Sequence, residues 1–354
     1  MRVLNRCVIG CILGTAVGDS LGLPYEGLSP DRARRMLGAS ARHRLLPRNG
    51  MVSDDTEHAC FTAQALLAAG SDPEAFERRL AWSLRWWLLG VPAGVGFATL
   101  RSILKLWLGF SPRRSGVFSA GNGPAMRSAL LGVAHGNDLV LLASLVRRST
   151  RLTHTDPKAC YGAMAVAVAA HCAASPQAVT ADGFLSLLGP ALDDEPAEEC
   201  MGLLRRAAES AEKREPLGDF AASIGSTRGI AGYTYHTVPC VIQVWLRHPE
   251  DFRRGVLEII AAGGDADTMA AILGGIIGAR VGTEGIPPAW LNGILDWPRS
   301  VRWMERLGER LAESLASGEP ARPLPVFVPA IPLRNLLFLS VVLFHGFRRL
   351  APPY

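Results

Sequence analysis

The sequence predicts an all-α protein built around a large hydrophobic core. Apolar residues make up 49% of the 354 residues and charged residues 19%, a balance typical of a globular chain and not of a disordered one. Ala, Leu and Gly dominate, whereas alternating runs of strand formers and convincing β-hairpin signals are scarce. Helix-start signals, in which a capping side chain precedes an early proline or an acidic turn, recur along the chain.

These signals place the helices in order. Asp72-Pro73-Glu74 opens a segment that runs to residue 89, and Asp156-Pro157 opens an alanine-rich segment that runs to residue 174. Apolar and amphipathic patterns predict further helices over 139–146, 195–214, 248–262 and 300–316. Glycine-rich stretches predict loops over 109–123 and 225–234.

Composition also narrows the compartment and the ligand. A net charge of +5 suits an anionic ligand, but no Lys/Arg stripe is interleaved with aromatics, so we expect no nucleic-acid partner. The seven cysteines are scattered and include no C-x-x-C pair, which argues against zinc and disulfide frameworks. Residues 1–18 imitate a signal peptide, yet the run continues into Gly18-Asp19-Ser20-Leu21-Gly22, so we expect a cytoplasmic protein.

Proline marks the end of the predicted domain. We expect a catalytic domain over 1–317, followed over 318–354 by a linker and a C-terminal apolar helix; residues 318–332 hold five prolines. The uncharged part of helix 335–349 is shorter than the roughly 20 residues that span a bilayer. A helix docked on the domain or on a partner chain is favoured, and a membrane-surface anchor is the alternative. The sequence leaves the oligomeric state open.

Two acidic clusters carry the chemistry. In the first, Gly263-Gly264 allows a tight turn, and Asp265, Asp267 and Thr268 then begin an apolar helix. Crowded hard oxygen ligands of this kind suit Mg²⁺, Mn²⁺ or Ca²⁺, although a single Asp there could simply cap the helix. The second cluster, Ser53-Asp54-Asp55-Thr56-Glu57, has the same design, and a capping box formed by Ser53 or Asp54 with Glu57 is its alternative.

Three further signals are weaker. Glycines at positions 10, 14 and 18 give one smooth helix face, and Glu26 follows this helix in a loop where glutamate is usually just solvated. Gly121-Asn122-Gly123 is a turn that could hold a phosphate or hydroxyl, or could be a plain turn. His154 could enter a pocket or merely accompany a helix cap.

Together these motifs resemble those of the ADP-ribosylglycohydrolase family, which includes the hydrolase that reactivates dinitrogen reductase and the ADP-ribosyl-acceptor hydrolases. The resemblance runs from about Val8 to Gly282, and its most specific part is the pairing of S/T-D-D-T with G-G-D-x-D-T. It implies a compact multi-helix domain with a binuclear metal cleft, two divalent cations (Mg²⁺ or Mn²⁺), and hydrolysis of the glycosidic bond of an ADP-ribosyl group on a protein or a small conjugate.

Carried over position by position, the resemblance implies three groups of residues. The metal ligands would be Ser53, Asp54, Asp55, Asp265, Asp267 and Thr268. The acid or base would be Glu26 or Asp55. The substrate contacts would be Gly121, Asn122, Gly123, His154 and Tyr233.

Two departures and two rival functions accompany this resemblance. Ser53 stands where threonine is usual, and Gly94 stands where arginine-specific members often carry an acidic residue, which puts an arginine-linked substrate in doubt. The first rival is a non-catalytic protein that binds ADP-ribose or a nucleotide on the same scaffold. The second is a hydrolase of another glycoside or of a phosphate ester.

Overall fold

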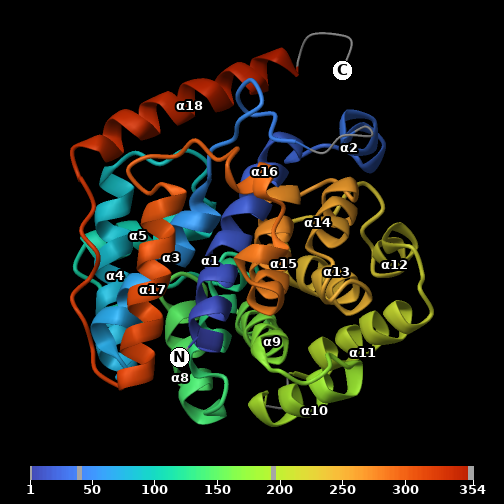
Figure 1. Cartoon of the computed structure of the whole chain (residues 1–354), viewed down its shortest axis with the longest axis horizontal. Helices are drawn as coiled ribbons and strands as arrows, with labels where there is room; N and C mark the ends of the chain where they lie inside the picture. Colours follow the sequence, from blue (N-terminus) through green and yellow to red (C-terminus); the bar gives the residue numbers. More distant parts are fainter. Residues whose placement is uncertain (1, 38–41, 193–196, 350–354) are drawn as a thin grey trace.

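The computed structural model describes residues 2–37, 42–192 and 197–349 and is helical throughout these ranges, with isolated β-bridges but no strand (Figure 1). The all-α prediction is therefore confirmed. The α-helices are α1 (Arg2–Gly22), α2 (Pro30–Leu37), α3 (Asp54–Ala69), α4 (Pro73–Leu89), α5 (Phe97–Trp107), α6 (Pro112–Ser115), α7 (Ala129–His135), α8 (Leu139–Arg151), α9 (Pro157–Ala174), α10 (Ala181–Ala191), α11 (Glu198–Glu212), α12 (Leu217–Ser223), α13 (Thr234–Arg247), α14 (Phe252–Ala261), α15 (Ala266–Val281), α16 (Pro288–Leu291), α17 (Val301–Ser317) and α18 (Ala330–Arg348). Short 3₁₀ turns are η1 (Leu23–Tyr25), η2 (Ala125–Arg127) and η4 (Thr283–Gly285).

Helices α1 and α15 form an antiparallel pair at the centre of the molecule (Figure 1). A Cβ atom added to Gly14 would lie 2.1 Å from the Gly274 oxygen, and one added to Gly18 would lie 1.9 Å from the Ala270 oxygen. Only glycine permits backbones this close, so the glycine spacing of α1 sets the distance between the two helices. The pairing brings the end of α1 beside the start of α15, where the acidic residues lie.

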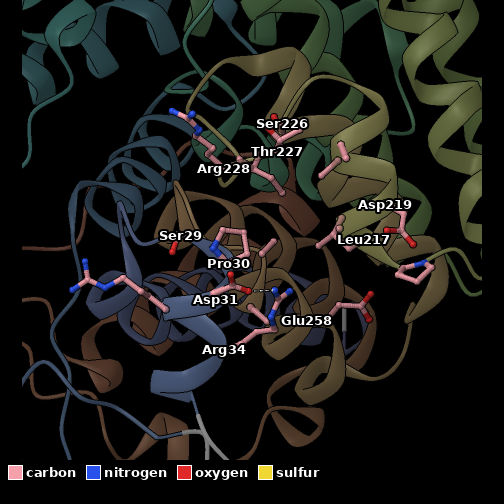
Figure 2. Close-up of a pocket in the computed structure, with 18 of the residues that line it drawn as sticks. Ser29, Pro30, Asp31, Arg34, Leu217, Asp219, Ser226, Thr227, Arg228 and Glu258 are labelled. Carbon is pink, nitrogen blue, oxygen red and sulfur yellow. Dashed lines mark hydrogen bonds and ion pairs between the residues drawn. The ribbon is translucent and has the colours of Figure 1, made fainter. Parts of the chain in front are cut away.

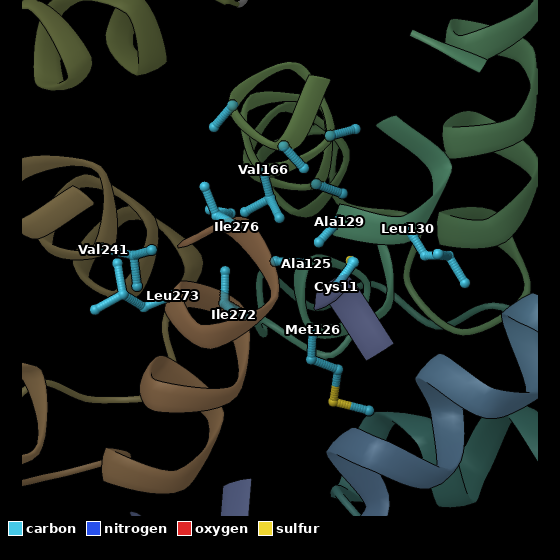
Figure 3. Packing of buried hydrophobic residues seen from close by; sticks show 14 of the residues in the cluster. Cys11, Ala125, Met126, Ala129, Leu130, Val166, Val241, Ile272, Leu273 and Ile276 are labelled. Carbon is cyan, nitrogen blue, oxygen red and sulfur yellow. The ribbon is translucent and has the colours of Figure 1, made fainter. Parts of the chain in front are cut away.

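The core surrounds this pair. Figure 3 shows Ile272, Leu273 and Ile276 of α15 packed with Val166 of α9 and Val241 of α13, all buried. Helix α15 is buried nearly all round, which explains why it carries no amphipathic pattern. The charged residues that begin it are thus held at the edge of a rigid core.

Most helix boundaries follow the predicted caps. Asp72 accepts from the backbone N–H groups of Glu74 and Ala75 at the start of α4, and Asp156 accepts from that of Lys158 at the start of α9. Helix α14 instead begins after Asp251, which accepts from the N–H of Arg254, so the predicted start at residue 248 is wrong by one turn. The predicted loop over 109–123 contains the short helix α6. The first residues of the predicted helix 195–214 lie outside the described residues.

The C-terminal helix lies across one end of the molecule (Figure 1). It begins at Ala330, one turn before the predicted start, and its buried residues include Arg334 and Asn335. By length and composition two helices could cross a membrane: Arg2–Tyr25, which is 94% buried inside the protein, and Ala330–Arg348, which is 22% buried. The tail helix is therefore docked on the domain, as favoured, but most of its surface is open.

Candidate active site

Three backbone segments are joined in front of α15. Gly27 donates its N–H to the Gly264 oxygen at 2.7 Å, and Asp265 donates to the Ile230 oxygen at 2.8 Å. Gly263 and Gly264 have φ angles of 65° and 79°, and a Cβ on Gly264 would lie 2.1 Å from the Ile230 oxygen. The two glycines are therefore required both by the turn and by the close approach of its neighbours.

The start of α3 is held by a buried aspartate of α1. Asp19 accepts from the N–H of Ser53 at 2.8 Å and from the N–H and hydroxyl of Thr56. Ser53 is the N-cap, because its hydroxyl accepts from the N–H of Asp55. Glu57 does not reach back to complete a capping box; its carboxylate binds Arg299 and the indole of Trp87 instead. The capping-box alternative is thus partly confirmed: Ser53 is the cap, but the carboxylate that accepts from its backbone N–H is Asp19 and not Glu57.

The two acidic clusters meet at Asp55. Its Oδ2 atom accepts from the hydroxyl of Ser53 at 3.2 Å and from the hydroxyl of Thr268 at 3.2 Å. Thr268 is 213 residues away in sequence, so this contact brings the two helix starts together. We call the resulting cluster of side chains the acidic pocket; it comprises Asp19, Ser53, Asp54, Asp55, Asp265, Asp267 and Thr268. Asp265 occupies the N-cap position of α15 without making a capping bond, because its carboxylate accepts from the side chain of Asn122.

The pocket concentrates buried negative charge. Asp19, Asp55 and Asp267 are at most 5% exposed, and each has an Oδ1 atom without a hydrogen-bond partner among the residues that the structure describes. Burial raises the pKa of Asp19 to about 6 despite the bonds from Thr56 and Ser53. Burial and then repulsion from neighbouring carboxylates raise the pKa values of Asp54, Asp55 and Asp267 well above the ordinary range. With Asp265, these are five neighbouring carboxylates, which are stable together only with a positive charge or protons.

The donor set suits a hard divalent cation. Ser53, Asp54, Asp55, Asp265, Asp267 and Thr268 supply carboxylate and hydroxyl oxygens, which Mg²⁺ and Mn²⁺ prefer. The unpartnered oxygens of Asp55 and Asp267 are the atoms that such a cation would satisfy. Across the described ranges, no three carboxylate, imidazole or thiol groups already form a preassembled metal-binding set.

Glu26 lies close enough to the acidic pocket for its charge to interact with those of Asp265 and Asp267. Its side chain is exposed in the loop after η1, and the surrounding protein and then the charge of Asp265 raise its pKa, whereas Arg349 lowers it. Gly94 lies on another side, with a φ angle of 79°. A Cβ on Gly94 would be 4.0 Å from Oδ1 of Asp54, so a side chain at this position would point at the cluster.

The predicted substrate loop packs beside the cluster. Asn122 donates its N–H to the Gly232 oxygen at 3.0 Å, and its side chain bridges Asp265 and Thr237. His154 lies under this loop: a Cβ on Gly121 would be 3.0 Å from its Nε2 atom, and one on Gly123 would be 3.2 Å from its Cε1 atom. Burial, assisted by Arg127, lowers the pKa of His154 to about 3, so the imidazole is neutral.

Tyr233 lies next to Gly121, on the same side of the acidic pocket. A β-bridge joins it to Gly121, and its hydroxyl lies 3.2 Å from the Lys158 ammonium. Its ring is half-buried and packs against Tyr235 and His236. The structure therefore places Gly121, Asn122, Gly123, His154 and Tyr233 along one side of the acidic pocket.

Two residues that organise the site, Asp19 and Arg127, have no role that the sequence alone predicts. Asp19 was visible as part of G-D-x-L-G, but one Asp inside an apolar helix carries no pattern that reveals its partner. Arg127 is fully buried and donates to the Ser149 oxygen at 2.7 Å, the Thr153 hydroxyl at 2.7 Å and the Gly123 oxygen at 3.2 Å. It fixes the substrate loop to the end of α8; its position within G-N-G-x-x-M-R was the available signal.

A cleft adjoins the acidic pocket without containing it. It has a volume of about 1040 Å³ and lies between α2, α12 and α14, where Figure 2 shows Asp31 and Arg34 facing Leu217, Asp219 and Glu258. Gly27 and Ile230, which flank Gly264, belong to its lining, whereas none of the six predicted metal ligands does. The cleft is thus a polar surface next to the site.

Comparison with known proteins identifies the scaffold. The chain matches the ADP-ribosylglycohydrolase family over residues 2–321. It is 33% identical to an uncharacterized protein of Archaeoglobus fulgidus, with 86% of this chain and 95% of that protein covered. A solved structure described as an ADP-ribosylglycohydrolase-related protein complex superposes with a TM-score of 0.64 at 28% identity, covering 88% of this chain and 99% of that one.

Named enzymes are among the similar proteins. ADP-ribosylhydrolase ARH3 of Gallus gallus is 28% identical, with 79% of this chain and 87% of that protein covered. ADP-ribosyl-[dinitrogen reductase] glycohydrolase of Rhodospirillum rubrum is 26% identical, with 80% of this chain and 88% of that protein covered. The chain belongs to the ADP-ribosylglycohydrolase family, and it is a hydrolase of ADP-ribose glycosidic linkages.

Proposed function

We propose that the chain uses two divalent cations, Mg²⁺ or Mn²⁺, to hydrolyse the glycosidic bond of an ADP-ribosylated protein or small ADP-ribose conjugate. The observation that carries this proposal is the meeting of both acidic clusters at Asp55, with hydroxyls of Ser53 and Thr268 on one oxygen and no partner on the other. Burying the carboxylate of Asp55 among the other acidic side chains of the cluster costs free energy of folding unless a cation neutralises the charge. The ligands would be Ser53, Asp54, Asp55, Asp265, Asp267 and Thr268.

The cations would neutralise the carboxylates and orient the ribose hydroxyls beside the scissile bond. Asn122 supports this arrangement, because its amide binds one oxygen of Asp265 and so directs the carboxylate toward the cluster. Asp19 holds the backbone of Ser53 and Thr56 and thereby fixes the direction in which Asp54 and Asp55 project. Both are positioning residues.

Glu26 is the better candidate for the acid or base. Asp55 is 1% exposed and already accepts two hydroxyl hydrogen bonds, so it has little freedom to exchange a proton with water. Glu26 is accessible, and its raised pKa keeps its carboxyl protonated to a higher pH than that of an ordinary glutamate, which suits a group that donates or accepts a proton. We assign it the proton transfer that accompanies attack of water on the anomeric carbon, with charge on the sugar ring stabilised by the nearby carboxylates.

The glycines of the substrate loop leave room for His154. A Cβ at Gly121 or Gly123 would meet the imidazole at 3.0 or 3.2 Å, so glycine at both positions lets His154 lie directly against the loop. The backbone N–H groups of this loop are the groups that would bind a diphosphate or a distal ribose. The aromatic ring of Tyr233 lies beside this loop and can pack against the nucleotide.

A substrate panel tests the proposal. ADP-ribosyl-arginine, ADP-ribosyl-serine, O-acetyl-ADP-ribose and a simple phosphate ester are incubated with the protein in Mg²⁺, in Mn²⁺ and in EDTA. Release of ADP-ribose in either metal, and its loss in EDTA, is the expected result. Equal turnover in EDTA contradicts the metal role. Tight ADP-ribose binding without turnover of any conjugate would favour the non-catalytic binding protein, and turnover of the phosphate ester alone would favour a different hydrolase.

A further inference from the structure

The C-terminal helix α18 exposes an apolar face to solvent. Its side toward the domain is mixed, because Arg334 and Asn335 are buried there together with Ala330 and Phe338. Its side toward solvent is apolar, with exposed fractions of 49% to 69% at Leu333, Leu336, Leu337, Leu343, Phe344 and Phe347. A helix on the surface of a soluble protein normally presents its polar face to water. The outer face of α18 is therefore suited to a nonpolar environment.

The polar contacts hold α18 along the surface. Arg334 forms a buried ion pair with Asp296 at 2.6 Å, and Asn335 donates to the Gly90 oxygen at 2.7 Å. At the other end, Arg349 donates to the Pro24 oxygen at 2.7 Å and to the Glu26 oxygen at 2.8 Å. A helix that crossed a bilayer would lose all of these bonds. Helix α18 therefore lies flat along one side of the molecule, with its apolar face toward solvent (Figure 1).

Charge around this face is positive. Residues 320–354 contain four arginines and no Asp or Glu. One surface hollow between α2 and α18, of about 380 Å³, is lined by five arginines: Arg32, Arg35, Arg44, Arg348 and Arg349. An apolar helix face beside clustered arginines is the pattern of a helix that lies in the interface of an anionic bilayer.

Exposed tryptophans extend the apolar surface beyond the start of α18. Trp82 and Trp86 of α4 are 55% and 52% exposed, and their rings pack edge to face. They line a groove that also includes Val328 and Ile331, so they adjoin the first turn of α18. Tryptophan is the side chain that most favours the boundary between headgroups and hydrocarbon.

We propose that α18 is an interfacial helix that docks the enzyme on an anionic lipid bilayer, with Leu336 and Phe344 inserted and the arginines of the hollow between α2 and α18 against the headgroups. A second copy of this chain is the competing occupant. The positive charge favours the bilayer, because two such surfaces placed together would bring like charges into proximity, whereas anionic headgroups neutralise them.

Vesicle sedimentation of the full chain tests this proposal. We expect the protein to pellet with vesicles of phosphatidylcholine and phosphatidylglycerol, to bind pure phosphatidylcholine more weakly, and to dissociate as salt is raised. The double variant Leu336→Glu/Phe344→Glu should bind the anionic vesicles at least about tenfold more weakly, because each substitution replaces an inserted apolar group by a charge. Both positions are exposed, so the melting temperature should stay within error.

Val140→Glu is the matched control, because Val140 is 83% exposed on α8, at the opposite end of the molecule (Figure 1). It should bind vesicles as the unaltered protein does. Equal binding by the double variant would overturn the proposal. So would a protein that ignores vesicles but forms a dimer in sedimentation velocity, with the dimer lost in the double variant, since the face would then join two copies.

Discussion

The acidic pocket and the outer face of α18 both break the ordinary partition of polar and apolar side chains, in opposite senses. The pocket buries carboxylates such as Asp55 and Asp267, whereas α18 exposes Leu336 and Phe344. The pocket needs segments 213 residues apart, held together by glycine contacts between α1 and α15. The outer face needs one continuous helix, which lies beyond the family match at residue 321. The acidic pocket therefore depends on the packing of the whole core, whereas the outer face of α18 depends only on the few contacts that hold this helix on the domain.

One ion pair connects the two regions. Arg334 of α18 binds Asp296 and also donates to the backbone oxygen of Val52, the residue before Ser53. Asp296 in turn accepts from the N–H of Val52 at 3.0 Å. The tail helix therefore supports the backbone that leads into the second acidic cluster. Substitutions in the acidic pocket, in the core and at this ion pair therefore test how far the two regions depend on each other.

The largest effect is expected from Asp267→Asn. Removing one buried carboxylate should lower ADP-ribose release about 1000-fold, the scale on which one preorganised electrostatic group acts. It should also abolish the rise in melting temperature that we expect Mg²⁺ or Mn²⁺ to give the unaltered protein. Vesicle binding should not change. Asp182→Asn, an exposed aspartate of α10, is the control and should behave as the unaltered protein. Undiminished turnover in the Asp267 variant would contradict the metal role.

The pH dependence of the same variant has a definite sign. The pKa of Asp267 is raised in the folded protein, by burial and then by Glu26, so folding favours its protonated form. In EDTA this group's contribution to stability is full below its ordinary pKa of 3.8 and is lost as pH rises through the folded value. His154 is buried and neutral, and its pKa is lowered to about 3. Its contribution to stability therefore has the opposite pH dependence: it is lost as pH falls below the ordinary value of 6.5. The difference between the unaltered protein and the Asn variant isolates Asp267.

That difference is measured by urea unfolding in EDTA between pH 5 and pH 8. Asp267→Asn should exceed the unaltered protein in free energy of unfolding at pH 8, and the gap should narrow toward pH 5. A gap that widens on acidification would show that Asp267 is stabilised as a carboxylate without a cation.

Arg334→Ala should have the next largest effect, on both regions together. It leaves the carboxylate of Asp296 buried without its partner, which costs about 3–5 kcal/mol of unfolding free energy. Burial already raises the pKa of Asp296 in spite of Arg334, so the variant carboxyl should take up a proton at still higher pH. Unfolding curves provide the measurement. The double variant with Asp296→Asn should recover part of the loss, and a strictly additive cycle would contradict the coupling.

The sequence predicts the acidic clusters better than it predicts the orientation of α18. The motifs at 53–57 and 263–268 carry the resemblance, which implies that both clusters supply one metal site, and the contact of Thr268 with Asp55 places the two clusters together. The role of Asp19 was not predictable, since its partners come from another helix. For α18, periodicity separates an apolar face from one with Arg334 and Asn335, but cannot say which face meets the domain. The buried partner Asp296 decides that, and no local pattern reveals it.

Gly14→Ala tests whether the pocket depends on the core as claimed. The added Cβ would lie 2.1 Å from the Gly274 oxygen, so α1 and α15 must separate, at a cost of about 1–3 kcal/mol. Gly202→Ala in α11 is the control: nothing lies within 4 Å of its Cβ, and it should gain about 0.5–1 kcal/mol through helix propensity. Thermal melts and metal titrations check both. If Gly14→Ala loses stability but keeps its metal affinity, the acidic pocket depends less on the α1–α15 spacing than its geometry indicates.

The smallest effect is expected from Gly94→Asp, which adds a carboxylate to the pocket. Gly94 has a φ angle of 79°, a conformation that aspartate tolerates at a cost of about 1 kcal/mol. The new side chain would begin 4.0 Å from Oδ1 of Asp54 and add an acidic residue at the position where the family resemblance implies one in arginine-specific members. We expect a few-fold rise in hydrolysis of ADP-ribosyl-arginine relative to ADP-ribosyl-serine, measured as a ratio of kcat/KM values. Gly94→Ala controls for backbone strain without adding charge, and an equal ratio in both variants would show that the carboxylate at this position does not set linkage preference.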